Sequence, residues 1–157
     1  MVYLIGVNHS CQYESPIDRK IVREERLAFQ NHVLEITHKY NISLLAEEFS
    51  EEAKMKARVS ESILEKLGKT EGIEQRFCDP TSIEKKENGI ADNDDDRREQ
   101  FWLSRIQDCK NKNVLFVCGY THVESFRKKL ITAGFVVEHE SKHWFNFSNR
   151  ELWDSDP

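Results

Sequence analysis

The chain has 157 residues, a length that fits one domain with a hydrophobic core. Hydrophobic residues make up 38% of it and charged residues 32%, a composition typical of a folded protein with a heavily charged surface. The formal net charge of −5 at pH 7 argues against a broad basic face for nucleic acid, although it leaves a local contact with a nucleotide open.

No apolar run approaches the ~18 residues of a membrane span, and no basic segment precedes the first apolar run, so neither a membrane anchor nor a signal peptide is expected. The four cysteines, Cys11, Cys78, Cys109 and Cys118, form no CxxC pair. We interpret them as reduced thiols of a cytoplasmic protein rather than a disulfide framework. Cys11 follows His9 closely, but nothing in the sequence lowers its pKa, so it is not favoured as a nucleophile.

The first half of the chain alternates strand and helix patterns. A buried strand is expected over residues 2–8, followed by a long helix that begins at Ser15-Pro16 and carries an apolar stripe. A second strand covers residues 42–46. Ser50 is the expected N-cap of the next helix, which ends near Gly68 and Gly72 and buries Ala53, Ala57, Ser60, Leu64 and Leu67.

The second half continues the alternation. A weaker strand is expected over residues 74–78, and then a flexible polar and acidic loop over residues 81–96. A helix begins at the aspartates of that loop, a strand begins at Val114, and Thr121 and Glu124 have the spacing of a helix capping box. A last strand covers residues 135–138, and an aromatic tail covers residues 141–157. The pattern β-α-β-α-β-α-β-α-β predicts a single α/β domain, whose predominantly parallel sheet has helices on both faces.

Two strands end in the same short pattern, Gly-x-x-His. Gly6 and His9 close the first strand, and Gly119 and His122 close the strand that begins at Val114. Ligands of open parallel sheets bind outside the carboxyl ends of the strands. Glu47, Glu48 and Asp79 also follow strands. The sequence therefore predicts a site in which two imidazoles and a carboxylate meet at one edge of the sheet.

Such a group could act in two ways. His9, His122, Glu48 and Asp79 are candidate ligands of a divalent metal such as Zn, Mn, Co or Fe, which would lower the pKa of a bound water. Without metal, the histidines and a glutamate could serve as general bases acting on water. Arg97 or Arg98 could clamp an anionic group or stabilise developing negative charge, and Tyr120 could donate a hydrogen bond at the same edge.

Each motif also has an ordinary structural explanation. A single Gly-x-x-His is often a turn with a solvated histidine, and Asp79-Pro80 is often only a turn. Glu47 and Glu48 could simply begin a helix, where carboxylates are favoured. Only one of two consecutive glutamates is expected to point into the site, and the residues alone do not decide which.

The ordered set of motifs resembles a known superfamily. Gly6-Val-Asn-His9, Glu48 before Phe49, Asp96-Arg97-Arg98 and Gly119-Tyr-Thr-His122 are similar to motifs of the TraB/TIKI, erythromycin esterase and ChaN superfamily. The resemblance implies an α/β domain with a polar cleft, and favours Glu48 over Glu47. It implies metal-dependent peptide cleavage in one branch, ester or lactone hydrolysis at a His/Glu site in another, and iron or haem binding in a third. This chain is shorter than typical members, and Asn8 departs from their first motif.

Three functions are expected in order of preference. The first is a small cytoplasmic hydrolase that activates water against a small-molecule or peptide substrate whose scissile bond is an ester, amide or phosphoester. The alternative is a binding module for a nucleotide or other phosphorylated ligand, which would use the helix after Thr121 and the two arginines. The third is a partner protein, with a homodimer included, whose contact surface is the aromatic tail with Trp144, Phe145, Phe147 and Trp153.

Overall fold

The computed structural model describes residues 1–14, residues 23–139 and Trp144. The described strands are β1 (Val2–Val7), β2 (Leu44–Glu47), β3 (Glu74–Phe77), β4 (Val114–Gly119) and β5 (Val137–His139). The α-helices are α1 (Arg23–Lys39), α2 (Glu51–Ala57), α3 (Ile63–Glu71), α4 (Ser82–Glu87), α5 (Asp95–Ile106) and α6 (Val123–Thr132). Short 3₁₀ turns occupy η1 (His9–Cys11), η2 (Gln107–Cys109) and η3 (Tyr120–His122).

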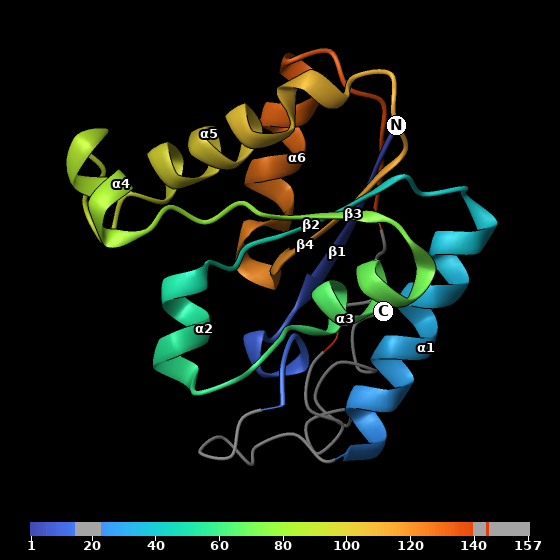
Figure 1. Ribbon diagram of the computed structural model, residues 1–157. Coiled ribbons are helices and arrows are strands. Elements are labelled where there is room, and N and C mark those ends of the chain that lie inside the picture. Colours follow the sequence, from blue (N-terminus) through green and yellow to red (C-terminus); the bar gives the residue numbers. More distant parts are fainter. Residues whose placement is uncertain (15–22, 140–143, 145–157) are drawn as a thin grey trace, which may run out of the picture.

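The five strands form one all-parallel sheet in the order β3-β2-β4-β1-β5 (Figure 1). β4 lies at its centre and pairs with β1 from Val2↔Val114 to Val7↔Gly119. On its other side it pairs with β2, from Leu44↔Val114 to Glu47↔Val117. The predicted α/β class is therefore confirmed. The two strands that end in Gly-x-x-His are direct neighbours, and the strand that ends in two glutamates lies beside them.

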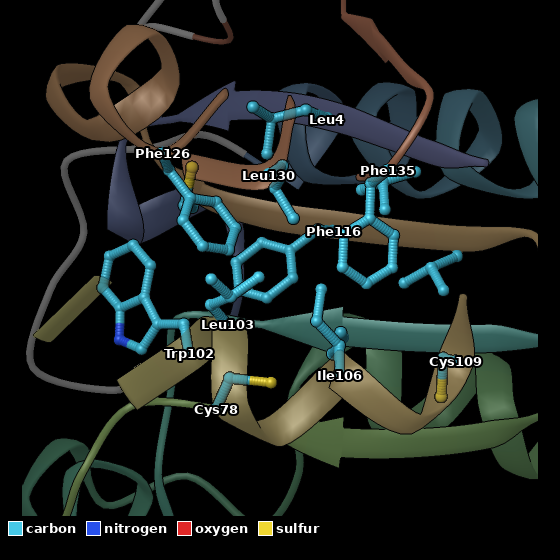
Figure 2. Close-up of a cluster of buried hydrophobic side chains, with 14 of the residues drawn as sticks. Leu4, Cys78, Trp102, Leu103, Ile106, Cys109, Phe116, Phe126, Leu130 and Phe135 are labelled. Carbon is cyan, nitrogen blue, oxygen red and sulfur yellow. The ribbon is translucent and has the colours of Figure 1, made fainter. Parts of the chain in front are cut away.

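Helices cover both faces of the sheet, with α5 and α6 on one side and α1 and α3 on the other (Figure 1). Each face has its own hydrophobic core. Trp102, Ile106, Phe116 and Phe126 belong to the first core, which Figure 2 shows around the aromatic rings. Phe29, Val33, Ile36, Leu64 and Leu67 belong to the second. β1, β2 and β4 are buried between the two cores, which is why their sequences are apolar runs rather than alternating patterns.

Trp144 is the one described residue of the expected aromatic tail. It forms a parallel bridge with Val7, its side chain is buried, and its ring lies 5.5 Å from that of Phe29. Its backbone carbonyl also accepts a hydrogen bond from the Asn8 amide. The tail residues Phe145, Phe147 and Trp153, and the expected helix start at Ser15-Pro16, lie outside the described residues.

The expected helix after Ser50 is two helices. Ser50 caps α2 as expected, but α2 ends at Ala57, and the next residue, Arg58, has a left-handed conformation with φ of 55°. A new helix begins at Ser62, whose hydroxyl accepts a hydrogen bond from the Glu65 amide. Apolar spacing continues across the break, so periodicity alone could not reveal it. Because of the break, Ala53 and Ala57 are partly exposed beside a pocket instead of being packed in the core.

The segment expected as a polar loop, residues 81–96, contains the helix α4. Thr81 and Glu84 form a reciprocal capping box at its start, a signal that the abundance of polar residues in this segment obscured. The capping box expected at Thr121 and Glu124 is wrong. The chain passes through η3 instead, and His122 precedes α6 without a side-chain cap.

Candidate active site

The carboxyl edge of the sheet brings together the three residues on which the predicted site depends. His9 Nε2 lies 3.8 Å from Glu48 Oε1, and His122 Nε2 lies 3.6 Å from the same oxygen atom. The two ring nitrogens therefore cannot be farther apart than the sum of these two distances, although the two histidines are 113 positions apart in sequence. The cause is the strand order, which places the ends of β1 and β2 on either side of β4.

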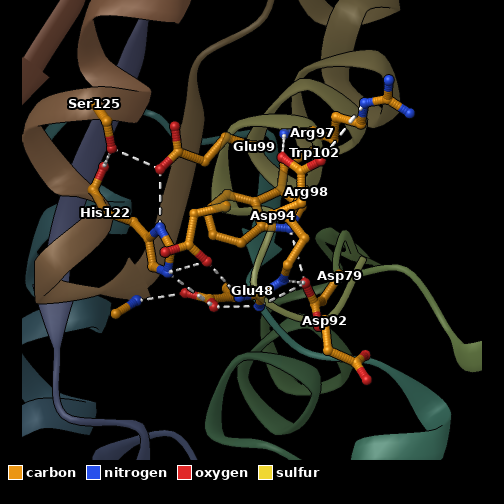
Figure 3. Close-up of polar contacts among 12 residues, drawn as sticks. Glu48, Asp79, Asp92, Asp94, Arg97, Arg98, Glu99, Trp102, His122 and Ser125 are labelled. Atoms are coloured by element: carbon orange, nitrogen blue, oxygen red, sulfur yellow. Dashed lines mark hydrogen bonds and ion pairs between the residues drawn. The ribbon is translucent and has the colours of Figure 1, made fainter. Parts of the chain in front are cut away.

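Glu48 is buried at the centre of this group, with a side chain that is 3% exposed. Its Oε2 accepts a hydrogen bond of 2.7 Å from the Gly119 amide, at the end of β4. Its Oε1 accepts one of 2.7 Å from Arg98 Nη2. Its own amide donates to the Val117 carbonyl and extends the pairing of β2 with β4 by one residue. Both carboxylate oxygens are thus held in place. Oε1 faces His122, as Figure 3 shows, and it also faces His9.

Arg98 joins three carboxylates. Its Nη2 donates to Glu48 Oε1 and to Asp79 Oδ1, the latter at 2.9 Å, and its Nη1 donates to Asp95. Asp79 Oδ1 also accepts the indole N–H of Trp102 at 3.0 Å. Burial acts to lower the pKa of Arg98, but the neighbouring Asp79 and Glu48 outweigh it and raise that pKa. Asp79 therefore orients Arg98, and Arg98 balances the charge of Glu48.

His9 is held by a neutral partner. Its Nδ1 lies 2.8 Å from the amide oxygen of Gln12, in the turn that follows β1. An amide oxygen can only accept a hydrogen bond, so Nδ1 carries a proton, and in the neutral ring Nε2 keeps its lone pair. The His9 side chain is about half exposed, and Nε2 faces Glu48 at the edge of the sheet.

His122 is held by a charged partner. Its Nδ1 lies 2.8 Å from Glu99 Oε1, and its side chain is 9% exposed (Figure 3). Ser125 and Lys129 also donate to the Glu99 carboxylate. The hydrogen bond to Glu99 raises the pKa of His122 against the effect of burial. Burial favours the neutral form of Glu99, but hydrogen bonds from His122, Ser125 and Lys129 lower its pKa overall.

Glu47 points away from the histidine pair. It is fully buried, and its carboxylate accepts hydrogen bonds from Ser62, Gln75 and Gln12. Burial raises the pKa of Glu47 to about 8. Consecutive strand residues face opposite sides of a sheet, so Glu48 and not Glu47 faces the two histidines.

Other predicted site residues lie outside this group. Arg97 is exposed and donates to the Gly89 carbonyl and pairs with Asp94. Tyr120 is 42% exposed and is not among the described residues that line the pocket beside His9. Cys11 is buried, and burial raises the pKa of its thiol to about 12, which disfavours a thiolate nucleophile.

Sequence reasoning missed the residues that hold the two imidazoles, Gln12 and Glu99. Gln12 follows His9 by three residues, which is the reach of one tight turn, so a polar residue at this spacing was an available signal. Glu99 directly follows the two arginines on α5, but nothing in its local pattern distinguishes it from the other charged residues of that helix.

A pocket of about 480 Å³ opens beside His9. Its apolar wall is formed by Tyr13, Phe49, Ala53 and Ala57, and its polar wall by His9, Glu48, Asp79, Arg98 and Lys56. A larger hollow of about 670 Å³ lies between α1 and α3 and holds none of the predicted site residues. It borders Glu14 and Arg23, which flank residues 15–22 that are not described. The pocket beside His9 is therefore the candidate substrate pocket.

The donor set has the chemistry of a metal site but a different geometry. Two imidazole nitrogens and a carboxylate suit a divalent transition metal, and each imidazole has its other nitrogen fixed by an oxygen acceptor, as metal-bound histidines do. However, the Glu48 oxygen that both imidazoles face is already in an ion pair with Arg98. In the described part of the chain, no three His, Cys, Asp or Glu side chains are arranged to hold a metal ion.

Comparisons of the chain with protein-family models, with curated proteins and with solved structures found no match. Within the described residues, no helix is both long enough and apolar enough to cross a membrane.

Proposed function

We propose that this protein is a small hydrolase in which His9, assisted by Glu48, activates a water molecule. The observation that carries the proposal is the convergence of His9 Nε2 and His122 Nε2 on Glu48 Oε1, at 3.8 and 3.6 Å. Atoms at these separations are too far apart for a direct hydrogen bond but can share one water molecule placed to their side.

His9 is the better general base of the two histidines. Its Nδ1 proton is donated to a neutral amide, and its Nε2 has an available lone pair at the edge of the pocket. As the water oxygen bonds to the substrate carbon or phosphorus, His9 Nε2 takes the proton, and Glu48 stabilises the imidazolium that forms. The same proton can then pass to the leaving group, which completes hydrolysis without another reactant.

His122 and Arg98 supply positive charge. The pKa of His122 is raised by Glu99, so this ring keeps its proton more readily than an ordinary imidazole. Arg98 lines the pocket and is fixed by Glu48 and Asp79. Fixed cationic groups are suited to stabilising negative charge that develops on a carbonyl or phosphoryl oxygen. The resemblance to the erythromycin esterase branch is consistent with this arrangement.

The pocket favours a neutral ester or amide with a small apolar group. Tyr13, Phe49 and the two alanines of α2 offer an apolar wall. Glu48 and Asp79 disfavour a highly charged anion, and most donors of Arg98 already bond carboxylates. The Gly119 amide also bonds Glu48. The alternative of a nucleotide-binding module therefore has less support than hydrolysis.

A divalent metal is a variant of the same proposal. His9, His122 and Glu48 would hold the ion, which would lower the pKa of a bound water. The ion pair between Glu48 and Arg98 favours the metal-independent form, because a cation would have to displace or tolerate the guanidinium.

The direct test is hydrolysis of chromogenic carboxyl esters, anilides and phosphoesters by the wild-type protein and by His9→Gln. We expect turnover of a carboxyl ester or an anilide by the wild type, and a loss of about 100-fold or more in His9→Gln. His38→Gln is a matched control, since His38 is an exposed histidine outside the site whose Nε2 lies 2.8 Å from Glu71. Equal turnover by His9→Gln and His38→Gln would refute the assignment of His9.

A further inference from the structure

We propose that Glu47 and Gln12 are positioning residues that keep the proton of His9 on Nδ1 and its Nε2 free to accept a proton. The inference rests on the proposed role of His9 as a base, and it extends the site through the sheet to a buried carboxylate. Neither residue lines the pocket beside His9. Glu47 acts by orienting the Gln12 amide, and Gln12 acts through its hydrogen bond to His9 Nδ1.

The orientation of the Gln12 amide is the first link. Its Oε1 lies 2.8 Å from His9 Nδ1, and its Nε2 lies 3.4 Å from Glu47 Oε2. An amide can be turned by half a rotation, which exchanges its donor and its acceptor. Above a pH of about 8, where Glu47 is ionised, its carboxylate oxygens accept and do not donate, so Glu47 selects the orientation in which the amide nitrogen faces it. The amide oxygen must then face His9.

The position of Glu47 is the second link. Its Oε1 accepts from Ser62 Oγ at 2.5 Å and from Gln75 Nε2 at 2.9 Å. Ser62 is fixed as the N-cap of α3, and Gln75 lies on the neighbouring strand β3. Oε1 is therefore fully engaged, and Oε2 is directed to Gln12. Gln12 itself is fully buried, so water does not compete for its amide.

The near-isosteric change Glu47→Gln tests this chain of hydrogen bonds. The oxygen of the new amide keeps the two donors Ser62 and Gln75, which places its NH₂ group opposite the Gln12 NH₂ group. Two donors cannot bond each other, so the Gln12 amide turns over. Its NH₂ then faces His9 Nδ1, which must become the acceptor, and the proton of the neutral ring moves to Nε2.

The measurement is a two-bond proton–nitrogen NMR spectrum of the histidine rings at about pH 9, where imidazoles are neutral. For wild type we expect a protonated Nδ1 and an unprotonated Nε2 in His9. For Glu47→Gln we expect the reverse, together with a kcat at the same pH lowered about 10- to 100-fold if a substrate is in hand. Gln75→Met is the matched control, because Gln75 bonds Glu47 Oε1 on the side away from Gln12, and its His9 ring should match wild type.

Two outcomes would overturn the inference. One is a wild-type His9 that carries its proton on Nε2, a result that needs no variant to fold. The other is a Glu47→Gln protein whose remaining histidine signals are native but whose His9 tautomer is unchanged. Since neither readout needs a substrate, a reversed tautomer combined with no hydrolysis by wild type would leave this inference standing and reject the hydrolase proposal instead.

Discussion

A Cβ atom added to Gly119 would lie 3.0 Å from His9 Nε2 and 3.3 Å from Glu48 Oε2. The second Gly-x-x-His glycine therefore leaves room for the histidine of the first motif, on the neighbouring strand. Its φ is −56°, a conformation that any residue adopts, so the requirement for glycine here is one of space and not of backbone freedom.

Gly119→Ala should therefore displace His9 with little backbone strain. We expect kcat to fall about 100-fold, because a misplacement of about 1 Å in a catalytic group has that effect. Gly72→Ala is the opposite case: its added Cβ meets nothing within 4 Å, but φ is 67°. It should lower the free energy of unfolding by about 1 kcal/mol and leave turnover intact. Similar kcat values for Gly119→Ala and Gly72→Ala would contradict the claim that a Cβ atom at residue 119 displaces His9.

Arg98 and Arg97 are adjacent in sequence but have different surroundings. Arg98→Met leaves buried Glu48 without its cation and should cost about 3 kcal/mol of unfolding free energy in urea titrations. Arg97→Met alters an exposed side chain and should change stability by less than about 0.5 kcal/mol. Equal losses of unfolding free energy in the two variants would show that the ion pair of Arg98 with Glu48 does not stabilise the fold.

The pair of His122 and Glu99 should stabilise the fold in a limited pH range. The pKa of His122 is raised, so its contribution to the stability of the fold is fully present below the ordinary pKa of 6.5. That contribution disappears as pH rises through the raised pKa. The pKa of Glu99 is lowered, so its contribution to the stability of the fold is fully present above the ordinary pKa of 4.5. That contribution disappears as pH falls through the lowered pKa. The stability difference between wild type and Glu99→Gln should be largest between pH 4.5 and 6.5. Glu124→Gln, on the exposed face of α6, should show no such maximum.

Glu47 should have the opposite effect on stability. Its pKa is raised from 4.5 to about 8 by burial, so the folded protein binds its proton more tightly than the unfolded chain does. Wild-type stability should therefore decline between pH 4.5 and about 8 relative to Glu47→Gln, and the difference should become constant above that range. The quantity to compare is the change of the unfolding free energy with pH, measured by urea titrations at several pH values. The substitution also alters hydrogen bonds, so the size of the difference at one pH does not isolate the titration of Glu47. If the difference in unfolding free energy between wild type and Glu47→Gln stayed constant from pH 4.5 to about 8, Glu47 would have an ordinary pKa in the folded protein.

Metal dependence can be tested by chelation. Because Arg98 already bonds the Glu48 oxygen that faces both imidazoles, we expect turnover to survive dialysis against EDTA. We also expect equal metal content in wild type and in a His9→Ala/His122→Ala variant. A loss of turnover that zinc or manganese restores, together with metal in wild type alone, would instead establish the metal-dependent variant of the site.

The sequence by itself determined the strands, their order along the chain and the residues at their ends. Apolar runs such as Val114–Gly119 are local patterns, and the rule that parallel strands deliver their ends to one edge predicts that His9, His122 and one of the two glutamates Glu47 and Glu48 lie together there. The break at Arg58 and the helix α4 escaped prediction because apolar spacing and polar composition do not record a left-handed residue or a capping contact.

Only the tertiary structure decided which member of each adjacent pair enters the site. Glu47 and Glu48, and Arg97 and Arg98, are alike as neighbours in sequence, but each member of a pair points in a different direction. The strand or helix packed against it then determines what it contacts. The partners of the imidazoles were also decided there, since Glu99 reaches His122 across the packing of α5 against α6. Such contacts depend on distances between elements, which no spacing along one segment contains.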